Sequence, residues 1–106
     1  MPLSQTQKRR LRALGHKLRP VVIIGNAGFS DAVREELEQA LDHHELLKVR
    51  VNAADREARR QMILALCEQA QAQLIHHVGH VILIYRRNPK RPKISLPPGQ
   101  QADENG

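Results

Sequence analysis

The chain has few of the residues on which several common kinds of function depend. It has one cysteine, Cys67, and therefore forms no internal disulfide. Aromatic residues make up 2% of its 106 residues, Phe29 and Tyr85 alone, which argues against a sheet that stacks several RNA bases on aromatic rings. It has no apolar run of about eighteen residues and no apolar stretch typical of a signal peptide. We therefore expect a cytoplasmic protein with no membrane partner.

Positive charge is abundant and unevenly distributed. The chain has 17 Lys and Arg against 11 Asp and Glu, for a formal charge of +6. Residues 1–24 and 86–97 contain basic residues and no acid, whereas residues 25–45 contain six acids and one arginine. This pattern predicts one face that binds a polyanion and another that is acidic. Charge alone leaves RNA and DNA open as partners.

The first part of the chain is predicted to be a basic amphipathic helix followed by a strand. Ser4 and Gln7 have the spacing of a capping box, and leucines recur every three or four residues up to about Lys17. Pro20 then ends any helix and begins an extended segment. The strand at 21–24 is apolar on both faces, which predicts a central position in the sheet.

The rest of the chain is predicted to hold two more helices and three more strands. Ser30 and Asp55 are suited to cap the helices, which are expected to end near residues 43 and 72. Apolar and basic residues alternate over 47–51, as in a strand with one buried face. The strands at 74–78 and 81–85 flank Gly79 as a hairpin.

This order, α-β-α-β-α-β-β, predicts a small single α/β domain with a mixed four-stranded sheet. The domain is expected to span residues 1–97, with Ile94 and Leu96 docked on it. Residues 98–106 are predicted to form a disordered tail. A chain of this length buries one core and leaves little room for an enclosed substrate pocket, so we expect no small-molecule substrate. We also expect a monomer.

The junction between the first strand and the second helix is the leading candidate site. Gly25 and Gly28 allow a left-handed backbone and close approach of a ligand. The helix that starts after Ser30 has unpaired N–H groups at its first turn, and these attract anions. An ordinary strand-to-helix turn has the same short pattern, so the motif is informative only together with the basic helix before it.

Several segments together resemble the CRM domain (chloroplast RNA splicing and ribosome maturation), in particular its stand-alone bacterial YhbY-type members. They are residues 11–25, the glycine loop 25–28, Asp55-Arg56-Glu57 and residues 93–97. The resemblance implies an RNA-binding domain with a fold similar to that of the C-terminal domain of translation initiation factor three. It also implies association with ribosomal RNA of large-subunit precursors and a role in ribosome assembly. The loop departs from many members in having Asn26 and Ala27 where a lysine often stands.

The residues expected to bind RNA lie in the basic helix, in the glycine loop that the resemblance also marks, and after the last strand. In the loop, backbone amides and the Asn26 side chain are expected to make the contacts. The full set is Lys8, Arg9, Arg12, Lys17, Arg19, Gly25, Asn26, Ala27, Gly28, Arg86 and Arg87.

Other functions remain as alternatives. A nuclease or RNA-modifying enzyme needs a catalytic cluster, and we identify no catalytic residue. His76, His77 and His80 lack further ligands in a metal-binding pattern, so we expect no metal and no cofactor. A DNA-binding architectural protein is the alternative that fits the charge. The basic segment 86–93 is equally compatible with an RNA contact and with a solubilising tail, and Phe29 is expected to fill the core rather than stack on a base.

Overall fold

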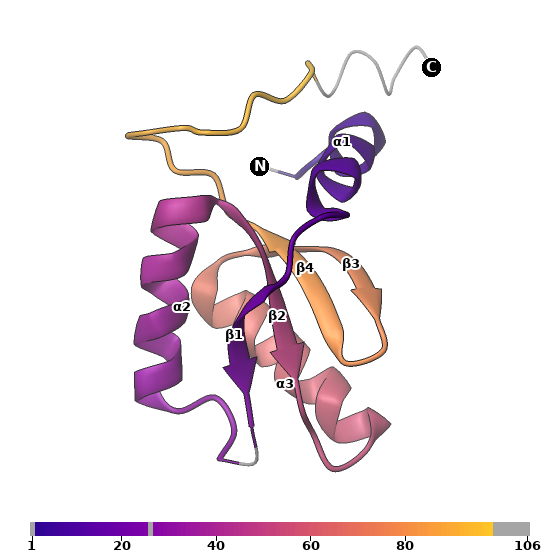
Figure 1. Cartoon of the computed structure of the whole chain (residues 1–106), viewed down its shortest axis with the longest axis vertical. Coiled ribbons are helices and arrows are strands. Elements are labelled where there is room, and N and C mark those ends of the chain that lie inside the picture. The colour runs from indigo at the N-terminus through magenta and orange to yellow at the C-terminus, as the bar shows by residue number, and fades with distance from the viewer. Residues whose placement is uncertain (1, 26, 99–106) are drawn as a thin grey trace.

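A computed structural model describes residues 2–25 and 27–98 of the chain (Figure 1). The predicted order of elements is confirmed. Asn26 and residues 99–106 lie outside the described residues, so the predicted tail and its boundary stay predictions. The elements are α1 (Gln5–Gly15), β1 (Pro20–Ile24), α2 (Asp31–His44), β2 (Leu46–Val51), α3 (Arg56–Ala70), β3 (Gln73–Val78) and β4 (Val81–Tyr85).

Local capping explains where the three helices begin. The Ser4 hydroxyl accepts a hydrogen bond from the Gln7 amide, and the Gln7 side chain accepts one from the Ser4 amide, both at 3.1 Å. Ser30 caps α2 and Asp55 caps α3 in the same way, through the amides of the third helical residues. The three predicted helix starts are thus confirmed.

The four strands form one mixed sheet in the order β1-β2-β4-β3. Strand β1 runs parallel to β2, and the other two pairs are antiparallel. The predicted hairpin of β3 and β4 is confirmed, and Gly79 adopts a φ of 59° in its turn. The prediction that β1 is central is wrong, because β1 is an edge strand with Val21 48% and Ile23 59% exposed.

One face of the sheet, here called the sealed face, is covered by α2 and α3. Its side chains and those of the two helices form the larger core, which includes Ile24, Leu37, Val49, Leu66 and Ile84. Phe29 and Cys67 pack against the edge of this core, as expected. Burial raises the pKa of the Cys67 thiol to about 11, so the thiol behaves as a small hydrophobe.

The other face is covered only in part, by α1 and by residues 86–98, here called the strap. Leu11 of α1 and Ile94 and Leu96 of the strap pack on a second, smaller cluster of sheet residues, which confirms that the two strap residues dock. A Cβ on Gly15 would lie 2.5 Å from a methyl carbon of Leu83, so glycine lets α1 approach the sheet closely. In Figure 1 the strap and α1 lie at one end of the sheet and the β1–α2 loop lies at the other.

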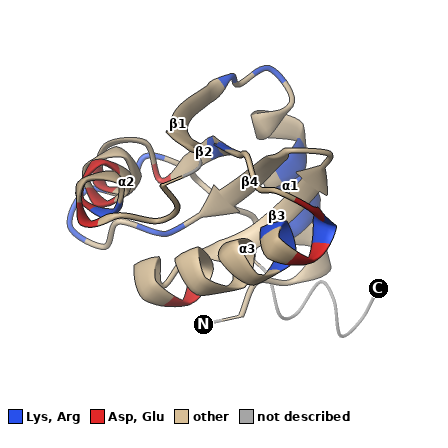
Figure 2. Cartoon of the chain, turned by 90° about the horizontal axis from the view of Figure 1, so that it is seen from below, with Lys and Arg blue, Asp and Glu red and all other residues tan. Residues whose placement is uncertain are grey.

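Charged residues are distributed differently over the helices on the two faces of the sheet. Acidic residues lie along α2, as Figure 2 shows, whereas α1 has no acidic residue. Among the helices that the structure describes, none is long and apolar enough to cross a membrane.

Candidate nucleic-acid interface

The glycine loop forms a tight turn at the carboxyl end of β1. The Gly28 amide donates to the Gly25 carbonyl at 3.0 Å, and the Ser30 amide donates to the Gly28 carbonyl at 3.0 Å. Gly28 has a φ of 79°, a left-handed conformation that a side chain would strain. Ala27 is exposed. Asn26, which we expected to contact RNA, lies outside the described residues.

Space above the loop is open at both glycines. A Cβ built on Gly25 or on Gly28 meets no protein atom within 4 Å. Gly25 does not have a left-handed φ, so a small side chain is tolerated there by the protein itself. A side chain at position 25 would therefore displace a ligand that approaches the backbone there, and not a part of the protein.

Two other segments meet the loop at this end of the sheet. The Asn52 amide, just after β2, donates to the Ile24 carbonyl at 2.9 Å, and the Val51 amide donates to the His80 carbonyl at 2.7 Å. Parallel pairing of β1 and β2 brings the starts of α2 and α3 to the same edge, with their positive dipole ends. Acidic residues at these starts offset part of that field, because Asp31 and Glu57 occupy the first turns.

Beside the loop, the uncovered part of the sheet presents a surface that we call the open face. One row runs across all four strands through the paired residues Ile23, Arg50, Val81 and Val78. Ile23 and Val78 are 59% and 63% exposed. The Arg50 guanidinium is exposed and donates from Nε to the Asn52 side-chain oxygen at 3.2 Å, which holds it next to the loop.

Lys48 occupies the next outward position on β2 and connects the open face to α1. It pairs in the sheet with Pro20, and Pro20 directly follows the segment that contains Lys17 and Arg19. Successive residues on one face of a strand are roughly 7 Å apart. Basic residues therefore occur in succession along the backbone from the end of α1 to the glycine loop. We call this set the basic track; it comprises Arg12, Lys17, Arg19, Lys48 and Arg50.

Apart from Asn26, the structure divides the residues predicted to bind RNA into three groups: those of α1 and of the connection to β1, where Lys17 and Arg19 lie, those of the glycine loop, and those after β4. Lys8, Arg9 and Arg12 lie on α1, at the end of β1 opposite to the glycine loop (Figure 1). Five residues of β1 separate the two by about 16 Å. The basic helix and the loop therefore form two ends of one surface rather than one compact site.

The third group consists of Arg86 and Arg87, which have different surroundings. The Arg86 guanidinium donates to the Glu38 carboxylate at 2.8 Å, to Asp42 at 2.9 Å and to the Ala70 carbonyl at 2.9 Å. These bonds connect the strap to α2 and to the end of α3, and they occupy most of its donors. Arg87 is exposed, and no ion pair is found for it among the described residues.

Sequence reasoning did not include Lys48 and Arg50 among the RNA-binding residues. The alternation over 47–51 already indicated that both face the same side of a strand. The alternation could not show which strand lies next to β2. Only the pairing of β2 with β1 brings Lys48 and Arg50 beside the glycine loop. Within the described residues, no group of three His, Cys, Asp or Glu side chains is placed to hold a metal ion.

Comparison with known proteins identifies relatives over most of the chain. The family model of the CRS1 / YhbY (CRM) domain matches residues 3–86. The Pseudomonas aeruginosa protein named "Probable RNA-binding protein PA4753" is 42% identical over 88% of this chain and 89% of its own length. A Haemophilus influenzae protein named "RNA-binding protein" is 42% identical over 90% of this chain and 95% of its own.

A solved structure has the same fold. The solution structure of SAV1595 from Staphylococcus aureus matches with a TM-score of 0.76 and 30% sequence identity, over 91% of this chain and 100% of that one. This match confirms the expected small α/β architecture with its mixed four-stranded sheet.

Proposed function

The chain belongs to the CRS1 / YhbY (CRM) domain family, and from this premise we propose that it is an RNA-binding protein for ribosomal RNA of large-subunit precursors. In this role it assists ribosome assembly without catalysing a reaction. We place it in the cytoplasm and expect it to act as a monomer. The names of the relatives support RNA as the partner.

The basic track is the observation that carries the proposal. It places cations from α1, the α1–β1 connection and β2 on the way to a glycine loop whose backbone is accessible. Lysine and arginine bind phosphates without reading sequence, and the shape of a folded RNA then decides where the protein binds. The accessible loop lets a phosphate approach backbone N–H groups closely.

Neutralising the middle of the track tests the proposal. Affinity of a Lys48→Gln, Arg50→Gln variant for a structured RNA is expected to fall at least tenfold. Its salt slope is expected to flatten by about one unit for each phosphate that the variant no longer neutralises. Fluorescence anisotropy over a salt series measures both. Lys90→Gln is the matched control, because Lys90 is exposed on the strap and its amide, not its side chain, makes the hydrogen bond to Asn88.

Equal binding by the double variant and the control would show that the open face does not contact RNA. A triple variant, Lys8→Gln, Arg9→Gln and Arg12→Gln, then asks whether α1 alone supplies the contact. Competition with duplex DNA separates the DNA alternative, and a preference for DNA would contradict the proposal.

Sedimentation of a tagged copy through a density gradient of bacterial extract tests the ribosomal part. The protein is expected to move with large-subunit precursors at low salt and to stay at the top at high salt, since the contacts are electrostatic. A protein that stays at the top under both conditions would contradict the ribosomal assignment and leave RNA binding itself intact.

A further inference from the structure

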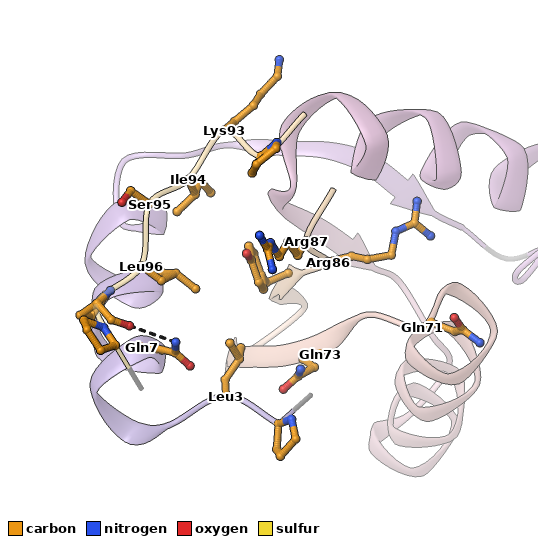
Figure 3. A pocket seen from close by; sticks show the side chains of 15 residues that line it. Leu3, Gln7, Gln71, Gln73, Arg86, Arg87, Lys93, Ile94, Ser95 and Leu96 are labelled. Atoms are coloured by element: carbon orange, nitrogen blue, oxygen red, sulfur yellow. Dashed lines mark hydrogen bonds between the residues drawn. The ribbon is translucent and has the colours of Figure 1, made fainter. Parts of the chain in front are cut away.

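A large open hollow lies at the end of the sheet away from the glycine loop. Its volume is about 1110 Å³, and its walls are the start of α1, the start of β3, the end of β4 and the strap (Figure 3). In Figure 3, Leu96 faces it from the strap and Leu3 from the segment before α1. The hollow is comparable in size to a ligand pocket and is open to solvent.

Among the residues that the structure describes, none that lines this hollow is acidic. The lining contains apolar side chains, the amides of Gln7, Gln71 and Gln73, and three cations, Arg86, Arg87 and Lys93. Arg86 is occupied by Glu38 and Asp42, and Lys93 extends away from the hollow in Figure 3. Arg87 is thus the cation that the hollow leaves for a ligand.

A buried carboxylate holds the strap in place. Glu45 lies between α2 and β2 and is fully buried, and its side chain accepts hydrogen bonds from the amides of Asn88, Lys93 and Ile94 at 2.6–2.9 Å. At the other end, the Gln7 side chain donates to the Pro97 carbonyl at 3.0 Å. The walls are therefore fixed before any ligand binds, which reduces the entropy lost on binding.

The charge of Glu45 does not repel a ligand in the hollow directly. Its carboxylate is enclosed and points at backbone N–H groups of the strap. The charge of Glu45 acts on the hollow through Tyr85. Burial and the Glu45 charge raise the pKa of Tyr85, whereas the Arg87 charge lowers it. The inner wall therefore presents a neutral phenol next to a cationic guanidinium.

We propose that this hollow is a second RNA site. It binds an unpaired segment of an RNA molecule whose folded part lies on the basic track. This inference rests on the proposed function. The phosphate contacts Arg87, and a base lies against the partly exposed side chains of Leu3 and Leu96, over the mostly buried Tyr85. Continuity supports RNA as the occupant, because α1 forms a wall of the hollow and also carries Lys8, Arg9 and Arg12.

Two RNAs that differ in one feature test this proposal. One is a blunt hairpin, and the other is the same hairpin with a short single-stranded extension. The full chain is expected to bind the extended RNA about tenfold more tightly. Arg87→Gln is expected to lose most of that gain and to weaken binding of the blunt hairpin by a smaller factor, whereas Lys90→Gln keeps the gain. Arg87→Lys is expected to retain part of it.

The possible failures are distinguishable. If the extension gives no gain in the unsubstituted chain, or if Arg87→Gln weakens both RNAs equally, the second site does not exist. If a short acidic peptide removes the gain at lower concentrations than single-stranded RNA does, the hollow is a peptide site and the proposal is overturned. The RNA-binding proposal itself fails only if neither RNA binds in a manner that depends on salt and on Lys48 and Arg50.

Discussion

The two faces of the sheet differ in how far helices cover their apolar residues. Neighbouring residues on β1 show this most directly, since Ile24 is fully buried under α2 and α3 while Ile23 is 59% exposed. The sealed face is covered by two helices along its length, and the other face is covered only where α1 and the strap reach. An apolar strand residue therefore does not imply a covering layer. On the open face, the cations Lys48 and Arg50 of β2 lie beside apolar side chains of the neighbouring strands.

The largest effect on the free energy of unfolding is expected from a substitution in the core under the sealed face. Ile24→Ala should lower the free energy of unfolding by about 3 kcal/mol, because it leaves a cavity in a close-packed core. Ile23→Ala should change it by less than about 0.5 kcal/mol. Urea denaturation measures both. A similar loss in the two variants would mean that a layer covers the open face as well.

The next effect concerns the attachment of the strap. Glu45→Ala removes the acceptor of three backbone hydrogen bonds, and we expect a loss of about 2 kcal/mol in urea denaturation. The loss is limited because a released strap regains hydrogen bonds to water. Limited proteolysis should then cut within residues 88–96 while the sealed face stays intact. A strap that resists proteolysis in this variant would show that Ile94 and Leu96 hold it without the carboxylate.

A smaller effect, on RNA binding rather than on stability, is expected at the glycine loop. Gly25→Ala should leave the free energy of unfolding almost unchanged, because the new Cβ meets no protein atom. It should weaken RNA binding about fivefold, or about 1 kcal/mol, by keeping the RNA away from the backbone. Gly28→Val is a less informative variant, because its φ of 79° adds strain to any effect on binding. Unchanged affinity in folded Gly25→Ala would remove the loop from the interface.

The smallest effect is expected at the surface of α3, near the loop end. Hydrogen bonds and charge attraction from Arg60, with Gln61, lower the pKa of Glu57 from 4.5 to about 2. The folded protein thus binds this proton less readily than the unfolded chain, so the pair stabilises above about pH 4.5 and its contribution is lost as the pH falls toward 2. Since Glu57 is exposed, the contribution is small. The difference in thermal midpoint between Glu57→Gln and the unsubstituted chain should vanish near pH 2; a constant difference would contradict this account.

Residue patterns predicted the elements well because the interactions that set them are local. Ser4, Ser30 and Asp55 each bond to an amide three residues on, and Gly79 turns the chain between adjacent strands. The docking of Ile94 and Leu96 also followed from their isolation in a polar, proline-rich segment. The family resemblance was carried by such local segments too, and the family model and the relatives confirm it.

The candidate site was predictable only in part. Its glycine loop and basic helix were identified, but the residue pattern did not show that they lie at opposite ends of β1. The link between them, Lys48 and Arg50, depends on strand pairing. The difference between Arg86 and Arg87 was also invisible, since it depends on acids more than forty residues away in the chain.

The sequence by itself determined the helices, the strands, their order and the basic character of the surface, because capping, turn formation and alternation act over a few residues. Tertiary structure alone decided that β1 lies at an edge and that Glu45 holds the strap. It also placed the cations of β2 beside the glycine loop. Each of these depends on contacts between distant segments, and such contacts form only when the whole sheet buries its sealed face.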